Sequence, residues 1–187
     1  MLKYIEEYAK YVEITGFSNA KIEDAAEFLK AVRKEKKTPC VQFFNAELVA
    51  TWEHLYFAAL NALLAFRNKM NISKNIAMEV MLYASAQRQI RKAIAFIGVK
   101  RGSANVAVAI VGENPDSVKT ALHAVSKLIG AAPNDAVLEL SKRKVLSIRR
   151  AFEISEKELE TVMKKNNLEE ALVDLVVERM ALLSTQL

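Results

Sequence analysis

An unbroken apolar segment near the middle of the chain constrains the fold more than any other feature. Residues 104–111 read ANVAVAIV and are followed by Gly112. Branched side chains occupy both of the alternating faces, at Val106, Val108, Ile110 and Val111. This pattern is typical of a strand that is buried on both sides. We therefore expect the strand to lie in a sheet that other elements cover.

Two further segments have the character of strands. Residues 8–17 alternate in part, and residues 40–44 form a short apolar run behind Pro39. Helical periodicity or helix caps mark residues 19–34, 46–69, 73–97, 115–130, 155–165 and 168 nearly to the C-terminus. Few strands among many helices predict an α+β fold, with a small, mainly antiparallel sheet of three to four strands covered by many helices. We expect a single domain over residues 1–187.

The composition limits the class of protein. With 187 residues, 52% of them hydrophobic, the chain is long enough to bury a core. Its single cysteine, Cys40, excludes an internal disulfide and a cysteine-ligated zinc cluster, and it fits a reducing compartment. The first residues, MLKYIEEYAKYVEITG, are charged throughout and show no signal peptide. No uncharged apolar run is long enough to span a bilayer. We expect a cytoplasmic protein that does not enter a membrane.

Positive charge is concentrated in one segment. Residues 67–101 contain eight lysines and arginines against a single acid, Glu79, and this excess of seven exceeds the net charge of +5 for the whole chain. Within the segment, residues 73–97 have the periodicity of one helix that Gly98 ends. Its mostly apolar face contains Ile76, Val80, Tyr83, Gln87, Ile90, Ile94 and Ile97.

A cationic stripe lies beside this apolar face on the expected helix. Lys74, Arg88 and Lys92 form the stripe, with Met81 and Ser85 between them. Phosphates attract positive charge, and unstacked bases need a polarisable surface. The pattern therefore predicts a site for single-stranded nucleic acid, and the alternative is a solvated helix face. The predicted RNA-binding residues are Lys69, Lys74, Met81, Arg88, Arg91 and Lys92.

The last helix has an apolar arc that covers more than half of its circumference. Its apolar residues are Leu168, Leu172, Val173, Leu175, Val176, Val177, Met180 and Leu183. A helix packed on its own domain usually needs a narrower stripe, so one flank is expected to meet a partner; the alternative is a central core helix. Residues 153–187 contain eight acids and four bases, which separates this face from the nucleic-acid face. The expected partner contacts are Leu175, Val176, Arg179, Met180 and Leu183.

The sequence contains no assembled set of catalytic or metal-ligating residues. His54 and His123 lie on separate expected helices without a second ligand at helical spacing, and Cys40 opens a buried-looking strand. The loop 98–102 resembles a phosphate loop only in composition, since it follows a helix and precedes a strand. Residues 142–150, KRKVLSIRR, form a second basic patch, which fits either a solvated turn or a nucleic-acid contact. We expect a binding or scaffold protein without cofactor or metal.

The order of these features resembles that of a known family. Residues 41–45, VQFFN, lead into a helix; residues 71–100 and then ANVAVAIVG, residues 104–112, follow. The most specific match is a motif of the form E-x-x-L-Y…RQI…A…G, which here consists of Glu79, Leu82, Tyr83, Arg88, Gln89, Ile90, Ala93 and Gly98. The chain resembles the kinase-binding subunit of the KEOPS (EKC) tRNA-modification complex, whose human member is called TPRKB. The similarity covers nearly the whole chain and departs from the family at the acidic segment 155–167.

The resemblance implies a subunit without catalytic activity that docks on the N-lobe of the small atypical kinase/ATPase of the complex. That kinase contacts the ATPase subunit that transfers threonylcarbamoyl to the adenosine next to the anticodon. Archaeal members are implicated in binding the single-stranded 3′ CCA end of tRNA. On this basis the basic helix is the RNA element and the last helix is the kinase element. The alternatives are a pure protein-interaction scaffold whose basic helix contacts an acidic partner, and a small-molecule enzyme whose site is built from scattered residues.

Overall fold

The computed structural model describes residues 1–20, 22, 39–164 and 167–185. Most of the helix expected over residues 19–34 lies outside the described residues. Four strands form one sheet in the order β1-β2-β4-β3, and every neighbouring pair is antiparallel. Their bounds are β1 Leu2–Ile5, β2 Lys10–Phe17, β3 Cys40–Asn45 and β4 Val106–Gly112. The expected α+β fold with a small antiparallel sheet is confirmed.

Strand β4 is one of the two inner strands of the sheet. All seven of its residues are buried, and it pairs with β2 on one side and β3 on the other. Val108, for example, lies opposite Thr15 of β2 and Phe43 of β3. The prediction of a doubly buried strand is therefore confirmed.

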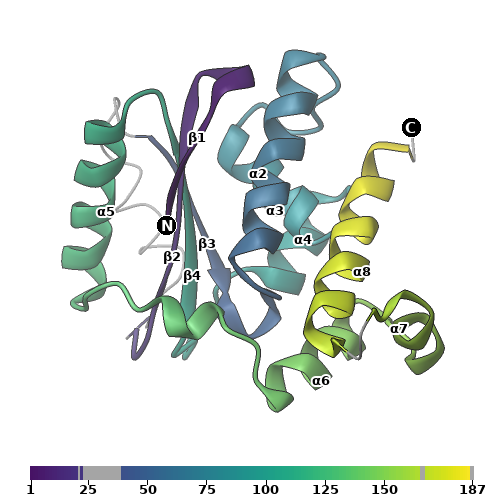
Figure 1. Ribbon diagram of the computed structural model, residues 1–187. Coiled ribbons are helices and arrows are strands. Elements are labelled where there is room, and N and C mark those ends of the chain that lie inside the picture. Colours follow the sequence, from purple (N-terminus) through teal and green to yellow (C-terminus); the bar gives the residue numbers. More distant parts are fainter. Residues whose placement is uncertain (21, 23–38, 165–166, 186–187) are drawn as a thin grey trace.

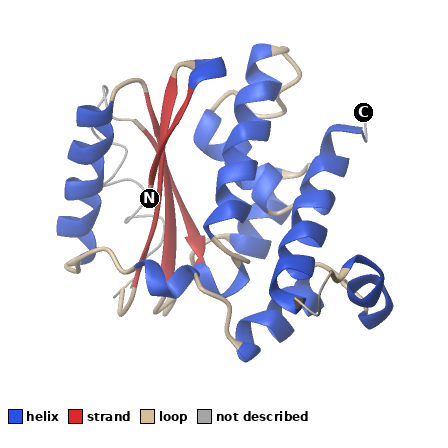
Figure 2. Ribbon diagram, in the orientation of Figure 1, coloured by secondary structure: helices blue, strands red, loops and turns tan. Residues whose placement is uncertain are grey.

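The two faces of β4 carry side chains of different size. Val106, Val108 and Ile110 belong to the hydrophobic cluster that α5 (Pro115–Ile129) covers through Val118, Ala121 and Val125. Ala107, Ala109 and Val111 belong to the cluster on the opposite face. Figures 1 and 2 show α5 alone on one side of the sheet among the described helices and the other long helices on the opposite side.

Helix α2 (Trp52–Arg67) packs on the alanine face of the sheet together with α3 (Ile76–Ala84). Four buried alanines of α2, Ala58, Ala59, Ala62 and Ala65, lie in the same cluster as Ala107 and Ala109. Methyl side chains on both sides of this contact leave room for the helix backbone to approach the sheet. The position of α2 is thus set by side-chain size along β4.

Capping residues mark where several of the remaining helices begin and end. Asn114 Oδ1 accepts a hydrogen bond from Ser117 N, 2.8 Å, at the start of α5, and Gly130, with φ +74°, ends that helix. The capping box of Ser155 and Glu158 opens α7 (Glu156–Val162), as expected. The other elements are η1 Glu6–Tyr8, η2 Ala46–Leu48, η3 Asp135–Leu138, α6 Lys142–Ala151, α8 Leu168–Leu182 and η4 Leu183–Thr185.

The prediction of a single helix over residues 73–97 is wrong. The chain forms α3, turns, and then forms α4 (Ile90–Ile97). At the turn Ala86 adopts φ +50°, and Gln87 N donates to the Leu82 carbonyl at 3.0 Å. The apolar period continues through the turn, so the sequence pattern does not show it. As a result Ile90 and Ile94 are 41% and 44% exposed and do not extend the buried face of α3.

Two smaller expectations also differ from the structure. The helix expected from Ala46 begins at Trp52, because residues 46–48 form a 3₁₀ turn and Thr51 caps α2. Strand β1 was not expected, since its four residues are too few to show alternation. In the described part of the chain, every helix is too short or too polar to cross a membrane.

His54 ties the start of α2 to the end of α3. Its ring is fully buried, Nδ1 accepts a hydrogen bond from Ala50 N at 3.1 Å, and Nε2 lies 2.8 Å from the Ala84 carbonyl. One neutral tautomer, protonated at Nε2, satisfies both contacts. Burial lowers the pKa of His54 to about 4, against a smaller opposing effect of the Ala84 carbonyl. His54 is therefore a structural residue.

The pKa of His54 predicts an acid sensitivity of the fold. Its folded-state pKa of about 4 lies below the unfolded value of 6.5, so the unfolded state takes up a proton first as the pH falls. The stabilisation of the fold by buried, neutral His54 is present above about pH 6.5 and is lost as the pH falls toward 4. We expect the free energy of unfolding to drop by about 2 kcal/mol between about pH 7 and pH 5. Urea unfolding at several pH values measures this drop.

A pair of variants tests whether His54 is responsible for this pH dependence of stability. His54→Gln should reduce the change in the free energy of unfolding between about pH 7 and pH 5. His123→Gln, on the exposed surface of α5, should leave that change as it is. An equal slope in both variants would show that another group is responsible.

Candidate functional site

A groove lies between the C-terminal part of α2, the turn that follows it, the end of α3 and η4. We call it the α2–α8 groove. Its volume of about 220 Å³ is below the range of about 300–1,000 Å³ for ordinary small-molecule pockets. It is therefore sized for a single base or side chain. The lining residues are Asn61, Leu64, Ala65, Asn68, Met70, Ile72, Tyr83, Arg88 and Leu183.

The groove combines apolar side chains with hydrogen-bond donors. Leu64, Met70 and Ile72 are 38%, 47% and 39% exposed. Arg88 Nη1 donates to the Leu183 carbonyl at 3.4 Å, which places the guanidinium at the end of α8. Burial, with a smaller effect of Glu79, raises the pKa of Tyr83, so its hydroxyl keeps the proton. An unstacked base can use both the apolar surface and the cation.

Glu79 holds the wall of the groove in place. Its carboxylate is fully buried, Oε1 accepts a hydrogen bond from Ile72 N at 3.1 Å, and Oε2 accepts one from Ser73 N at 2.7 Å. Charge-assisted hydrogen bonds of this kind are among the stronger ones in proteins. The only acid of the basic segment thus fixes the loop that carries Ile72.

Most of the sequence-predicted cations are free to meet a ligand. Lys69, Lys74, Arg91 and Lys92 are exposed, and none has an ion-pair partner among the described residues. Lys69 lies between two residues that line the groove. Arg67 is different: it pairs with Glu7 at 2.7 Å and lies 4.9 Å from the centre of the Tyr8 ring.

The prediction that Met81 is an apolar seat for a base is wrong. Its side chain is 3% exposed, and Sδ accepts a hydrogen bond from Gln42 Nε2 at 3.3 Å inside the domain. Because the expected helix is broken, Lys74, Arg88 and Lys92 also do not form one helical stripe. The structure instead brings Arg88 to the groove beside Met70, a residue that periodicity did not single out.

The second basic patch is largely occupied by internal contacts. Arg143 pairs with Glu47 at 2.7 Å, Arg149 pairs with Glu156 at 2.5 Å, and Lys144 Nζ donates to the Val137 carbonyl at 3.0 Å. Burial lowers the pKa of Lys144 to about 8, against the opposing charge of Glu47. Lys144 and Arg149 are therefore engaged within the domain, whereas the Arg143 side chain, although paired, is 78% exposed.

The expectation that the apolar flank of the last helix faces a partner is wrong. Leu175, Val176, Met180 and Leu183 are at most 3% exposed. The arc is wide because α8 packs into two hydrophobic clusters. Met180 and Leu183 pack with α2 and α3, and Leu175 and Val176 pack with α6 and α7. The alternative of a core helix is correct for these four residues.

Arg179 is engaged within the domain as well. Its Nη2 donates to Glu158 Oε1, which joins α8 to α7. Glu158 also accepts hydrogen bonds from Ser155 N and Ser155 Oγ, both at 2.8 Å. The backbone hydrogen bond from Ser155, followed by the bond from Arg179, lowers the pKa of Glu158 to about 2. This carboxylate stays ionised throughout the physiological range.

The outward side of α8 is acidic. Glu170, Asp174 and Glu178 are exposed at four-residue spacing, and Leu182, one further turn along, is 42% exposed. Residues at this spacing share one face of a helix. We call these four residues the acidic α8 stripe. The stripe is exposed, so a partner can reach it.

The remaining candidates for chemistry stay separate. Burial raises the pKa of the Cys40 thiol, which reduces its reactivity. Among the described residues, no three His, Cys, Asp or Glu side chains come together in a way that could hold a metal ion. Met70 and Ile72, on the loop between α2 and α3, were missed by sequence reasoning, and Leu183 was predicted as a partner contact instead of a groove residue. The available indication was Glu79, a lone acid in a basic and apolar segment.

Comparison with known proteins agrees with the sequence resemblance. The family model described as Kinase binding protein CGI-121 matches residues 19–184. The "Regulatory protein Cgi121" of Methanocaldococcus jannaschii is 35% identical over 113 residues, which cover 60% of this chain and 70% of that protein. The expected resemblance to KEOPS kinase-binding subunits is thereby confirmed at the level of the family. With a family match over most of its length, the chain belongs to the Kinase binding protein CGI-121 family.

Proposed function

We propose that this chain is a non-enzymatic accessory subunit of the KEOPS complex. In this role it docks on the small atypical kinase/ATPase of the complex and holds the single-stranded 3′ CCA end of tRNA. The threonylcarbamoyl-transferring ATPase subunit is then an indirect partner, reached through the kinase. Family membership supports the kinase-binding role.

The α2–α8 groove is the observation that carries the RNA part of the proposal. It is sized for one base, it has apolar walls, and Arg88 lies at its edge. Lys69 and Lys74 lie on either side of Met70 and Ile72 in the sequence. Arg91 and Lys92, which are on α4, come shortly after Arg88. Phosphates of a single strand bind to such exposed cations, while one base occupies the groove.

The acidic α8 stripe is the proposed contact for the kinase. It replaces the buried residues that the sequence suggested, and it leaves the core of α8 intact. Asp174 and Glu178 favour a basic surface on the partner, and Leu182 supplies an apolar contact. The kinase and RNA surfaces therefore carry opposite charge.

A specific observation also supports the second candidate, a protein-interaction scaffold. Ile90 and Ile94 are exposed on α4 next to Arg91 and Lys92. Exposed isoleucines beside cations fit an acidic protein partner better than a phosphate backbone. Titration of binding with intact tRNA and with tRNA that lacks CCA separates the two functions, because only the RNA-binding function depends on the CCA bases.

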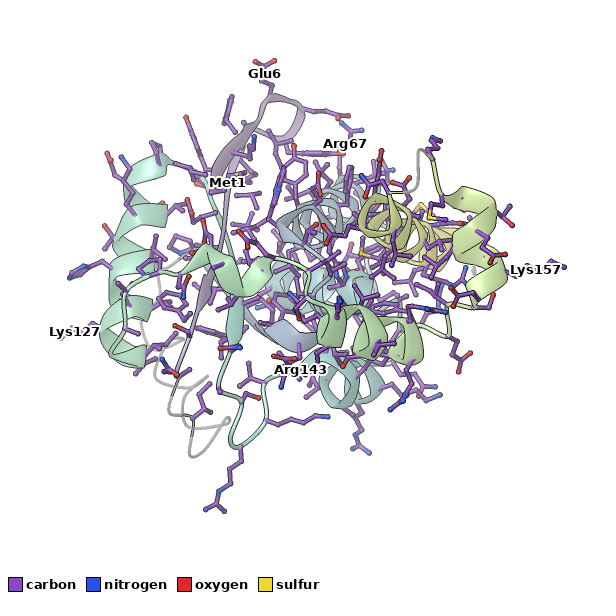
Figure 3. The ribbon with its side chains drawn as sticks, turned by 60° about the horizontal axis from the view of Figure 1, so that its bottom comes forward. Met1, Glu6, Arg67, Lys127, Arg143 and Lys157 are labelled. Carbon is purple, nitrogen blue, oxygen red and sulfur yellow. The ribbon has the colours of Figure 1, made fainter. Side chains whose placement is uncertain are left out.

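Arg88→Glu should weaken binding of intact tRNA at least about tenfold, which corresponds to about 1.4 kcal/mol. The change removes a cation from the groove and places a carboxylate near phosphates. Fluorescence anisotropy at fixed salt measures the affinity, and thermal unfolding checks the fold. Lys127→Glu makes the same change of charge on exposed α5, which lies far from Arg67 at the groove end of α2 (Figure 3). Equal affinities of the two variants would remove Arg88 from the RNA site.

Glu79→Gln should loosen the groove wall. The amide has one oxygen where the carboxylate accepts two N–H groups, so one buried donor loses its partner at a cost of about 1–3 kcal/mol. We expect faster hydrogen exchange at Ile72 and Ser73 and weaker CCA-dependent tRNA binding, with kinase capture unchanged. Glu160→Gln, at an exposed acid of α7, is the matched control. Unaltered exchange at both amides would contradict the role assigned to Glu79.

Asp174→Lys/Glu178→Lys should reduce kinase capture at least about tenfold, a loss of about 1.4 kcal/mol, because it reverses the charge of the acidic α8 stripe. Pull-down with the purified kinase measures capture, and tRNA affinity should not fall. Met180→Asp places a charge in the core and should instead destabilise the fold by about 3 kcal/mol or more. Normal capture by the folded double variant would move the kinase contact to another surface.

A further inference from the structure

A second hollow opens at the other end of α2. It lies between η2, the loop that precedes β4, and α6, and we call it the η2–α6 depression. Its volume is about 560 Å³ and it is open to solvent. Its polar lining includes Asn45, Glu47, Arg101, Ser103, Asn105 and Arg143. Figure 3 shows Arg143 below Arg67, which marks the groove end of α2.

The depression has an excess of positive charge. Arg101 and Arg143 line it, and Lys100 and Lys142 adjoin them in sequence, whereas Glu47 is the only acid among the described residues of the lining. Arg101 has no ion-pair partner among the described residues. Arginine is the side chain best suited to bind a phosphate through two hydrogen bonds.

Glu47 orients Arg143 and leaves most of it accessible. The ion pair is 2.7 Å long between Glu47 Oε1 and Arg143 Nη2, yet the Arg143 side chain is 78% exposed. Asn105 Nδ2 lies 3.5 Å from the same carboxylate oxygen, which fixes the acid to the start of β4. A guanidinium has five N–H groups, so Arg143 keeps donors for a ligand while it is held by Glu47.

Hydrogen bonds within the loop that carries Arg101 fix its conformation. Lys100 N donates to Ser103 Oγ, and Ser103 N donates to the Lys100 carbonyl, each at 3.0 Å. Gly102 adopts φ +80°, a conformation that favours glycine. The turn presents Arg101 at its tip, next to the mouth of the depression.

We propose that the η2–α6 depression binds phosphates of the RNA backbone and is a second contact for tRNA, separate from the α2–α8 groove. This inference rests on the proposed function and extends it. The described residues that line the depression include no aromatic side chain, so it offers charge without a surface for base stacking. Binding at the depression should therefore not depend on the base sequence of the RNA, which suits a base-paired region.

The length of α2 sets the spacing of the two contacts. Glu47 and Leu48 of the depression lie just before α2, and Asn61 to Asn68 of the groove lie at its C-terminal end. Sixteen helical residues rise about 24 Å. A nucleic-acid chain is long enough to reach both sites at once, whereas a small phosphate compound is not.

The test is the salt dependence of binding to tRNA that lacks CCA, between about 50 and 200 mM salt. Each lost phosphate contact lowers the slope of log K against log salt by about one. Arg101→Gln/Arg143→Gln should therefore reduce the slope by about two. Lys119→Gln/Lys127→Gln, which removes two exposed cations of α5, should leave it unchanged.

Three outcomes would overturn the inference. If intact tRNA binds in a CCA-dependent way while both double variants have the same slope, the depression is not an RNA contact and the proposed function stands. If no tRNA binds to the wild-type protein, this inference and the RNA part of the proposed function both fail. If ATP binds at the depression and competes with no RNA, the site belongs to a small phosphate ligand. A lower slope in the Arg101/Arg143 variant alone supports the inference.

Discussion

The alternation of side-chain size along β4 is the constraint on which the rest of the structure depends. Branched residues on one face fill the space under α5, and alanines on the other face admit α2. If both faces had large side chains, the helical layer could not lie where it does. The position of α2 then determines where its two ends lie, and both candidate binding hollows are built at those ends.

The sequence predicted the sheet better than the helices. Strand β4 was evident because every one of its residues is buried, and the caps at Asn114 and Ser155 marked helix starts by direct hydrogen bonding. The break at Ala86 was not predictable from periodicity, because the apolar spacing of α3 continues into α4. The same break brings Arg88 to the groove, whereas the error at Met81 has another cause, because α3 is buried on nearly all sides.

Burial and charge pairing explain the other differences at the candidate sites. An apolar helix face looks the same in sequence whether its own domain or a partner covers it, and α8 proved to lie between two internal clusters. A count of cations likewise does not show which ones are already paired. Arg67 and Arg143 have acidic partners that are distant in sequence, whereas Lys69 and Lys92 have none among the described residues. Only the fold distinguishes these cases.

The junction at Glu158 has a consequence for variation within the family. Because one carboxylate binds both the start of α7 and Arg179 of α8, the two helices are joined by side chains as well as by the chain itself. The angle between α7 and α8 is therefore held by this contact as well as by the chain that joins them. Relatives can gain or lose residues in this connection and still keep α7 in its place, provided that they keep the acid and the arginine. Divergent length in this connection is thus expected among relatives.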